Sequence, residues 1–163
     1  GFNHRNPGAV GAVLASDTAS AELIADGVHV HPAALKVLVR CLGPERVVLV
    51  TDSMPAAGLP DGEYSLVGQQ VTVQGGTARL ADGTLAGSTA TMPHCVRTMH
   101  RDADVPLYQA LQMASLNPAR VIGADKVTGS LQPGKTADLV VIDDDVNVYL
   151  TMVNGEIVYN RLF

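Results

Sequence analysis

A strand, a helix and a second strand follow one another between Ala21 and Asp52, and this order constrains the fold more than any other feature. Residues 23–30 form a short apolar run that turns polar near its end. Pro32 suits the first position of a helix, and apolar residues recur at helical spacing from 33 to 42. The β-branched run 46–50 is typical of a parallel strand covered on both faces. Two such strands joined by a helix predict a βαβ unit of an α/β fold.

The remaining sequence alternates between β and helical patterns. Residues 62–87 predict short antiparallel strands separated by glycine turns. Helical patterns return at 89–100 and 106–115, and Asn117 with Pro118 predicts an N-cap for a helix through Ile122. The last forty residues predict strands at 138–142, 148–153 and 156–159, the last two joined by the hairpin turn Asn154-Gly155.

A (β/α)₈ barrel takes about 250 residues, whereas this sequence has 163. We therefore expect the C-terminal portion of a (β/α)₈ barrel with an appended small β-sandwich segment. The expected division is residues 1–124 for the barrel part, including a β insertion at about 62–87, and residues 125–163 for the β-sandwich part. The first residues, beginning with Gly1, suggest a segment of something longer.

The composition argues against several classes of protein. Eleven Lys and Arg against sixteen Asp and Glu give a net charge of −5, and the positive charges do not cluster as in a nucleic-acid-binding protein. A membrane span needs about 20 apolar residues, and neither such a run nor a signal peptide is expected. Cys41 and Cys95 stand far apart, and we expect both to be buried thiols in a reducing compartment.

Asp52 is the main catalytic candidate. It follows the apolar strand directly, and the carboxyl ends of the strands form the active-site face of barrel enzymes. A carboxylate in that position suits general acid–base catalysis. The alternative is an ordinary helix-cap or turn aspartate.

His29 and His31 form a second candidate site. Two positions apart in an extended segment, they would point to the same face and could bind a metal. Alternatively, one lines a polar pocket and the other faces solvent or caps the helix at Pro32. His94 and His100 lie on different faces of a helix and are expected to be surface or packing residues.

Two loops complete the set of candidates. Arg5 lies in a turn-rich segment, where a guanidinium could clamp a phosphate or simply face solvent. Residues 85–89 join a β hairpin to a helix, and their backbone amides could contact a small ligand, although a plain junction explains them equally well.

Six segments follow one another along the chain: HRNPGAVGA, LIADGVHVHP, VVLVTDSMPAAG, DGTLAGSTATM, ASLNPARVIG and GSLQPGKTADLVVID. In this order they resemble the C-terminal half of N-acetylglucosamine-6-phosphate deacetylases, which are amidohydrolases. The resemblance covers about residues 4–160. The last segment is shared widely among amidohydrolases. The ADG-x-HV segment, the Thr51-Asp52 pair and the LAGS loop in succession are much more specific.

The resemblance implies a metal-dependent barrel enzyme that hydrolyses the acetamide of N-acetylglucosamine 6-phosphate. It implies that Asp52 accepts a proton from the metal-bound water and donates one to the leaving amine. It implies that His29 contacts the sugar phosphate and that Arg5 reaches a phosphate across a dimer interface. The implied substrate contacts are completed by Asp26, Gly27, Val28, Leu85, Ala86 and Gly87.

The metal ligands of that family, a glutamate and two histidines, lie upstream and have no counterpart here. We therefore expect no metal ligand in this chain, and a divalent metal, zinc, only in the complete enzyme. The resemblance further implies a cytoplasmic homodimer that binds an amino-sugar phosphate and neither nucleic acid nor membrane. Two alternatives stay open: an amidohydrolase acting on a cyclic amide or ureide, and a non-catalytic fragment.

Overall fold

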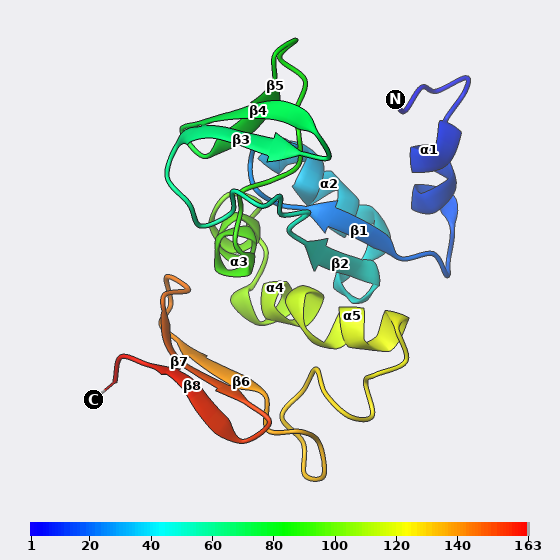
Figure 1. The fold of residues 1–163 in the computed structure, drawn as a ribbon. Coiled ribbons are helices and arrows are strands. Elements are labelled where there is room, and N and C mark those ends of the chain that lie inside the picture. Colours follow the sequence, from blue (N-terminus) through cyan, green and yellow to red (C-terminus); the bar gives the residue numbers. More distant parts are fainter. Residues whose placement is uncertain (163) are drawn as a thin grey trace.

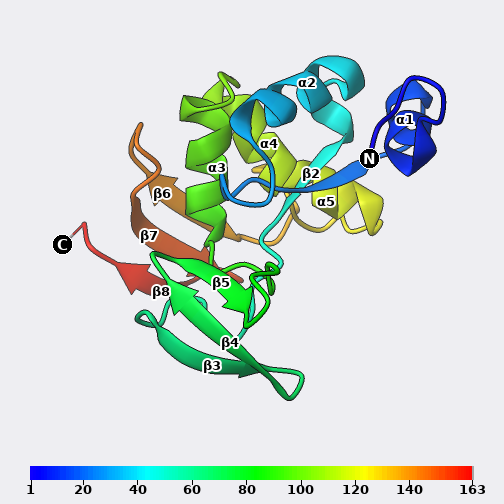
Figure 2. The same cartoon turned by 90° about the horizontal axis from the view of Figure 1, so that it is seen from above.

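The computed structural model describes residues 1–162, which form one βαβ unit, two antiparallel sheets and further helices (Figures 1 and 2). In chain order the elements are α1 (Gly8–Ala15), β1 (Ala21–Ile24), α2 (Pro32–Leu42), the 3₁₀ turn η1 (Pro44–Arg46), β2 (Val47–Val50), β3 (Gly62–Leu66), β4 (Gln69–Gln74), β5 (Thr77–Leu80), α3 (Met92–Arg101), α4 (Leu107–Ala114), α5 (Leu116–Val121), β6 (Leu139–Ile142), β7 (Val148–Val153) and β8 (Glu156–Asn160).

The βαβ unit is confirmed. β1 and β2 pair in parallel, with Ile24 opposite Val50, and α2 connects them. Val47, Val48 and Leu49 are all buried, as expected for a strand covered on both faces, and α3 and α4 both contact β2. The main hydrophobic core therefore lies around this strand pair.

Both strands are shorter than the sequence pattern predicts. β1 ends at Ile24 because the carboxylate of Asp26 accepts the backbone N–H groups of Val28 and His29, which folds the chain into a turn. Arg46 belongs to η1, and its Nε donates to the carbonyl of Leu42 at 2.8 Å. Its guanidinium thus satisfies a free carbonyl at the end of α2.

The antiparallel strands predicted within residues 62–87 are present. β3, β4 and β5 form an antiparallel sheet in that order. One face of this sheet, with Val71, Val73 and Ala78, is buried against Met54 and Ala56 from the segment after β2. A second, smaller core thus ties the insertion to the carboxyl end of β2.

The C-terminal strands β6, β7 and β8 form an antiparallel sheet in that order. Asn154 and Gly155, between β7 and β8, have φ angles of 52° and 83°. Positive φ at both positions is the requirement of the type I′ turn that this pair predicts.

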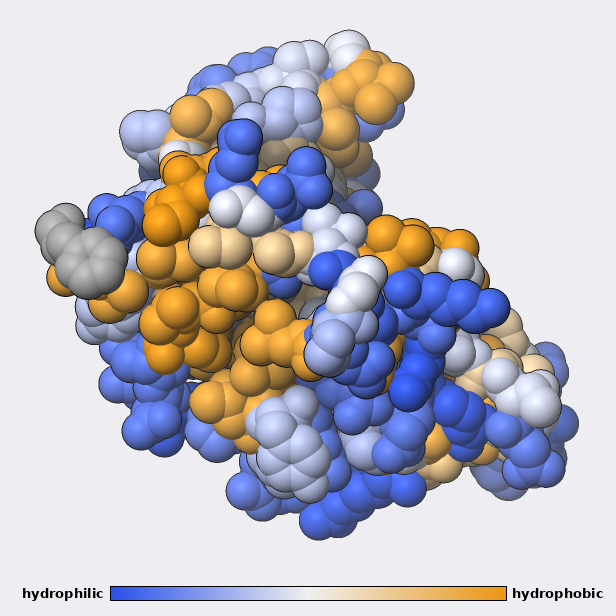
Figure 3. Space-filling model, turned by 90° about the horizontal axis from the view of Figure 1, so that it is seen from below, coloured by the Kyte–Doolittle hydropathy of each residue, from blue (hydrophilic) through white to orange (hydrophobic). Residues whose placement is uncertain are grey.

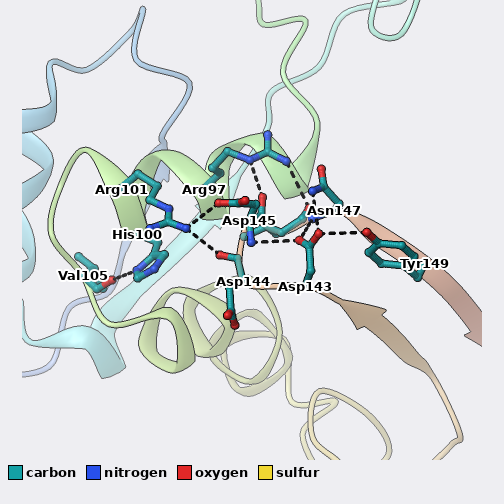
Figure 4. A network of polar contacts seen from close by, with 10 residues as sticks. Arg97, His100, Arg101, Val105, Asp143, Asp144, Asp145, Asn147 and Tyr149 are labelled. Carbon is teal, nitrogen blue, oxygen red and sulfur yellow. Dashed lines mark hydrogen bonds and ion pairs between the residues drawn. The ribbon is translucent and has the colours of Figure 1, made fainter.

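Two arginines of α3 hold the loop between β6 and β7 (Figure 4). Arg97 Nε donates to the carbonyl of Asp145 at 2.7 Å, and Arg101 pairs with the Asp145 carboxylate at 2.6 Å. Within the loop, Asp143 accepts hydrogen bonds from Asn147 and from the Tyr149 hydroxyl. These contacts fasten the C-terminal sheet to the helix that follows the insertion.

Two local expectations are wrong, and one helix has no counterpart among the predicted elements. Asn117 lies inside α5 rather than at its N-cap, and its buried Nδ2 donates to the carbonyls of Pro44 and Val47, both at 2.7 Å. Cys41 is exposed, because it lies on the outer side of α2, while Cys95 is buried as expected. Residues 8–15 form the helix α1, although their small and apolar residues show no helical periodicity.

An apolar area is visible on the face of the molecule shown in Figure 3. A groove of about 620 Å³ runs between α4–α5 and β6–β7, and its apolar lining includes Leu111, Ile122, Leu139 and Met152. Exposed apolar surface of this kind is typical of an interaction surface. Among residues 1–162, no helix is long and apolar enough to cross a lipid bilayer.

Candidate active site

The side chains of Asp26 and His29 are hydrogen-bonded in the turn that follows β1. His29 Nδ1 lies 2.7 Å from Asp26 Oδ2, while Asp26 Oδ1 accepts the N–H groups of Val28 at 2.9 Å and His29 at 2.8 Å. The Asp26 side chain is only 7% exposed. One carboxylate therefore fixes both the backbone of the turn and the orientation of the imidazole.

The charge of Asp26 is stabilised by these contacts. Burial by itself raises the pKa of Asp26, but the hydrogen bonds from His29 and Val28 outweigh it, so the pKa lies below the usual 3.8. The carboxylate stays ionised at neutral pH, and it holds His29 Nδ1, so that only Nε2 of this ring is left to meet a ligand.

Asp52 stands at the carboxyl end of β2 and is exposed. Its φ of 49° lies in the left-handed region, which aspartate enters more readily than most residues other than glycine. Val67, Asp104, Val146 and Asn154 also have positive φ, so this angle by itself does not mark a functional position.

The loop 85–88 is bonded directly to Asp52. The N–H of Ser88 donates to the carbonyl of Asp52 at 2.9 Å, and the N–H of Met54 donates to the carbonyl of Ser88 at 2.8 Å. Gly87 has a φ of 74°, and a Cβ at this position would come within 3.2 Å of Met54 Cβ and 3.4 Å of the Asp52 carbonyl. Only glycine allows the loop to approach Asp52 this closely.

The structure brings most of the predicted substrate residues together. A small hollow of about 10 Å³ is lined by five of them: Asp26, Val28, His29, Leu85 and Gly87. Gly27 and Ala86 are their neighbours in the chain, and Ala86 is buried. The hollow is barely the size of one water molecule, so a sugar would lie outside it. An adjoining cavity of about 330 Å³ shares Asp26 and Val28 with the hollow.

Arg5 is not part of this group. It lies in the exposed turn before α1, where its backbone N–H donates to Asn3 Oδ1. Figures 1 and 2 both place α1 to one side of the β1–β2 pair, away from the β3–β5 sheet. Arg5 does not line the hollow that His29 borders.

The expected geometry of the His29 and His31 pair is wrong, because residues 26–30 form a turn instead of an extended segment. His31 is the N-cap of α2, and its Nδ1 accepts the N–H of Ala33 at 3.2 Å. His29 is bound to Asp26. Across residues 1–162, no three His, Cys, Asp or Glu side chains are grouped closely enough to hold a metal.

Two further residues join the site. His94, in the first turn of α3, reaches back across 68 positions, and its Nε2 lies 3.1 Å from the backbone carbonyl of Asp26. Ser88, within the predicted loop 85–89, is 2% exposed, and its Oγ accepts the N–H of Ala90 at 2.9 Å. The contact of His94 depends on tertiary packing, which local patterns do not reveal.

Comparison with known proteins gives a consistent family. Residues 10–158 match the amidohydrolase family. A putative N-acetylgalactosamine-6-phosphate deacetylase of Escherichia coli is 49% identical over 157 residues, covering 96% of this chain and 93% of that protein. The N-acetylglucosamine-6-phosphate deacetylase of Vibrio furnissii is 44% identical over 160 residues, covering 98% of this chain and 40% of that protein.

Solved structures agree with this comparison. The crystal structure of N-acetylglucosamine-6-phosphate deacetylase from Pasteurella multocida superposes with a TM-score of 0.92 at 36% identity, over 97% of this chain and 41% of that one. The chain thus spans nearly the whole of one relative and about two fifths of the others described. This chain belongs to the amidohydrolase family.

Proposed function

We propose that this chain supplies the proton-transferring and substrate-binding side of an enzyme that hydrolyses the acetamide of N-acetylglucosamine 6-phosphate to glucosamine 6-phosphate and acetate. The observation that carries the proposal is the position of Asp52. It stands at the carboxyl end of β2, and its backbone is bonded to the loop containing Gly87. Relatives at 41–44% identity are named deacetylases of this substrate.

Asp52 acts as a general base and then as a general acid. It takes a proton from the water that adds to the acetamide carbonyl, and the tetrahedral intermediate then loses its C–N bond. The same proton passes to the departing amine, so that acetate and the free amino sugar result. An exposed carboxylate at the end of a buried strand is accessible to both the water and the amine.

The turn after β1 binds the phosphate end of the substrate. Asp26 holds His29 Nδ1, so that Nε2 is the ring nitrogen left to face a phosphate oxygen. Gly27 and Val28 border the sugar on this side, and Leu85, Ala86 and Gly87 border it on the other. Arg5 reaches the phosphate of the partner subunit in a homodimer.

Amidohydrolases are generally metal-dependent, but the residues described here do not fit a metal site. The imidazoles of His29, His31, His94 and His100 are all engaged by neighbouring protein groups. We therefore assign the divalent metal, zinc, and its ligands to the complete enzyme. The same proposal includes a barrel that residues 1–124 form with further chain, and a β-sandwich segment at residues 125–163. It also includes a cytoplasmic location.

A substrate panel tests the proposal. The complete, metal-containing enzyme is assayed for acetate release from N-acetylglucosamine 6-phosphate, its galactosamine epimer and the unphosphorylated sugar, and for ring opening of a cyclic ureide. We expect release from a phosphorylated sugar only, and about 10²–10⁴-fold slower release with Asp52→Asn. Asp17→Asn, at an exposed turn, is the control. Equal turnover by Asp52→Asn contradicts the proton-transfer role, and preference for the ureide identifies another amidohydrolase.

The galactosamine epimer is the second candidate substrate, because two Escherichia coli relatives named for it are 49% identical to this chain. The panel separates the epimers by their kcat/KM ratio.

A further alternative is a non-catalytic fragment. Metal analysis alongside the assay of this chain alone addresses it, because one equivalent of bound zinc together with turnover refutes the fragment, and absence of both supports it.

A further inference from the structure

The first turn of α3 makes one side-chain hydrogen bond to the backbone of the His29 turn. His94 Nε2 lies 3.1 Å from the backbone carbonyl oxygen of Asp26. Because a carbonyl oxygen only accepts, Nε2 carries the proton and donates it. This contact joins α3 to the segment between β1 and α2.

The bonded carbonyl belongs to the residue that organises the turn. The side chain of Asp26 holds the N–H groups of Val28 and His29 and the imidazole of His29. Its backbone carbonyl is held by His94 from the opposite direction. Asp26 is thus anchored at both its main chain and its side chain, and His29 is positioned through it.

His94 also faces open space. It lines the cavity of about 330 Å³ together with Asp26, Val28, Thr89 and Thr91. The opposite wall is the turn at Gly75 and Gly76, whose carbonyl at Gly76 accepts the hydroxyl of Thr89. The His94 side of this junction therefore faces solvent, while Ala25 and Cys95 belong to the buried core beside it. The hydrogen bond of His94 adds a polar restraint to that packing, directed at the Asp26 carbonyl.

We propose that His94 is a positioning residue, which fixes the Asp26–His29 turn in the conformation that receives the phosphate group of an amino-sugar phosphate. This inference rests on the proposed function for the identity of the ligand. The positioning of the turn stands on geometry alone. His94 acts through Asp26 and is assigned no direct part in proton transfer.

The test has a readout that needs neither turnover nor ligand. Amide hydrogen exchange of Val28 and His29 is measured by NMR in the wild-type chain and in His94→Ala. Loss of one hydrogen bond is expected to accelerate exchange of these two amides about 2- to 10-fold. His94→Gln, which keeps an N–H donor on a flexible side chain, is expected to restore part of the protection.

The matched control is His100→Ala. His100 lies on the same helix and donates from Nδ1 to the carbonyl of Val105 at 2.9 Å, which is the same type of contact away from the site. We expect this variant to leave the amides of Val28 and His29 unchanged. Unchanged exchange in His94→Ala, or equal acceleration in His100→Ala, overturns the proposal.

Ligand binding supplies the second readout. Glucosamine 6-phosphate and inorganic phosphate are titrated into the same variants, and we expect the Kd to rise about 2- to 10-fold in His94→Ala only. If exchange is faster in His94→Ala but neither this variant nor the wild type binds either phosphate compound, the proposed function is refuted and the positioning role stands. Binding that is equal in both proteins, with unchanged exchange, refutes the positioning role alone.

Discussion

Asp26 and Asp52 occupy equivalent places on two neighbouring parallel strands. Ile24 pairs with Val50, and each aspartate follows its paired residue by two positions. Adjacent strands lie about 4.8 Å apart, so the two segments leave the same edge of the sheet side by side. One carboxylate is buried in a turn and the other is exposed.

The positive φ of Asp52 predicts that two small substitutions at this position differ in their stability. Glycine adopts a φ of 49° freely, whereas alanine meets the same steric cost as other L-residues. We expect Asp52→Gly to be more stable than Asp52→Ala by about 1 kcal/mol, and both to be inactive. Urea unfolding of the two variants measures the difference. Equal midpoints would show that the backbone at Asp52 is relaxed in solution.

The low pKa of Asp26 predicts an acid-sensitive contribution to stability. Because the folded-state pKa lies below the unfolded value of 3.8, this contribution is present above about pH 4 and is lost as the pH falls through the folded value. Asp26→Asn should therefore flatten the dependence of the unfolding free energy on pH below about 4. Chemical denaturation at several pH values measures this slope, with Asp17→Asn as the control. A slope as steep as that of the wild type would place the acid sensitivity elsewhere.

Asn117 shows what the sequence does and does not predict. The residue type and the following Pro118 favour a cap, and a helix does begin nearby. Its real partners are carbonyls about seventy positions earlier, at Pro44 and Val47. Local patterns predicted the strand pair, the β insertion and the Asn154 turn because each depends on neighbouring residues. Contacts such as those of Asn117 and His94 depend on packing between distant segments.

The burial of Asn117 predicts a large loss of stability on its removal. Its side chain is 1% exposed, and it satisfies two backbone carbonyls while accepting from Gln112 Nε2 at 3.1 Å. Asn117→Ala leaves these groups unpaired, and we expect a cost of about 2–4 kcal/mol, against about 1 kcal/mol for a lost helix cap. Thermal or urea unfolding distinguishes the two values. Asn160→Ala, at an exposed position, is the control and should change stability by less than about 0.5 kcal/mol.

The two cysteines are predicted to differ sharply in reactivity. Cys95 is fully buried, and burial raises the pKa of its thiol to about 11, whereas Cys41 is exposed on α2. Because the thiolate is the reactive species, a thiol reagent at pH 8 should label one cysteine rapidly in the native chain and both after unfolding. Cys41→Ser should abolish the rapid phase, and Cys95→Ser should leave it unchanged. Rapid labelling that persists in Cys41→Ser would mean that the core around Cys95 opens readily in solution.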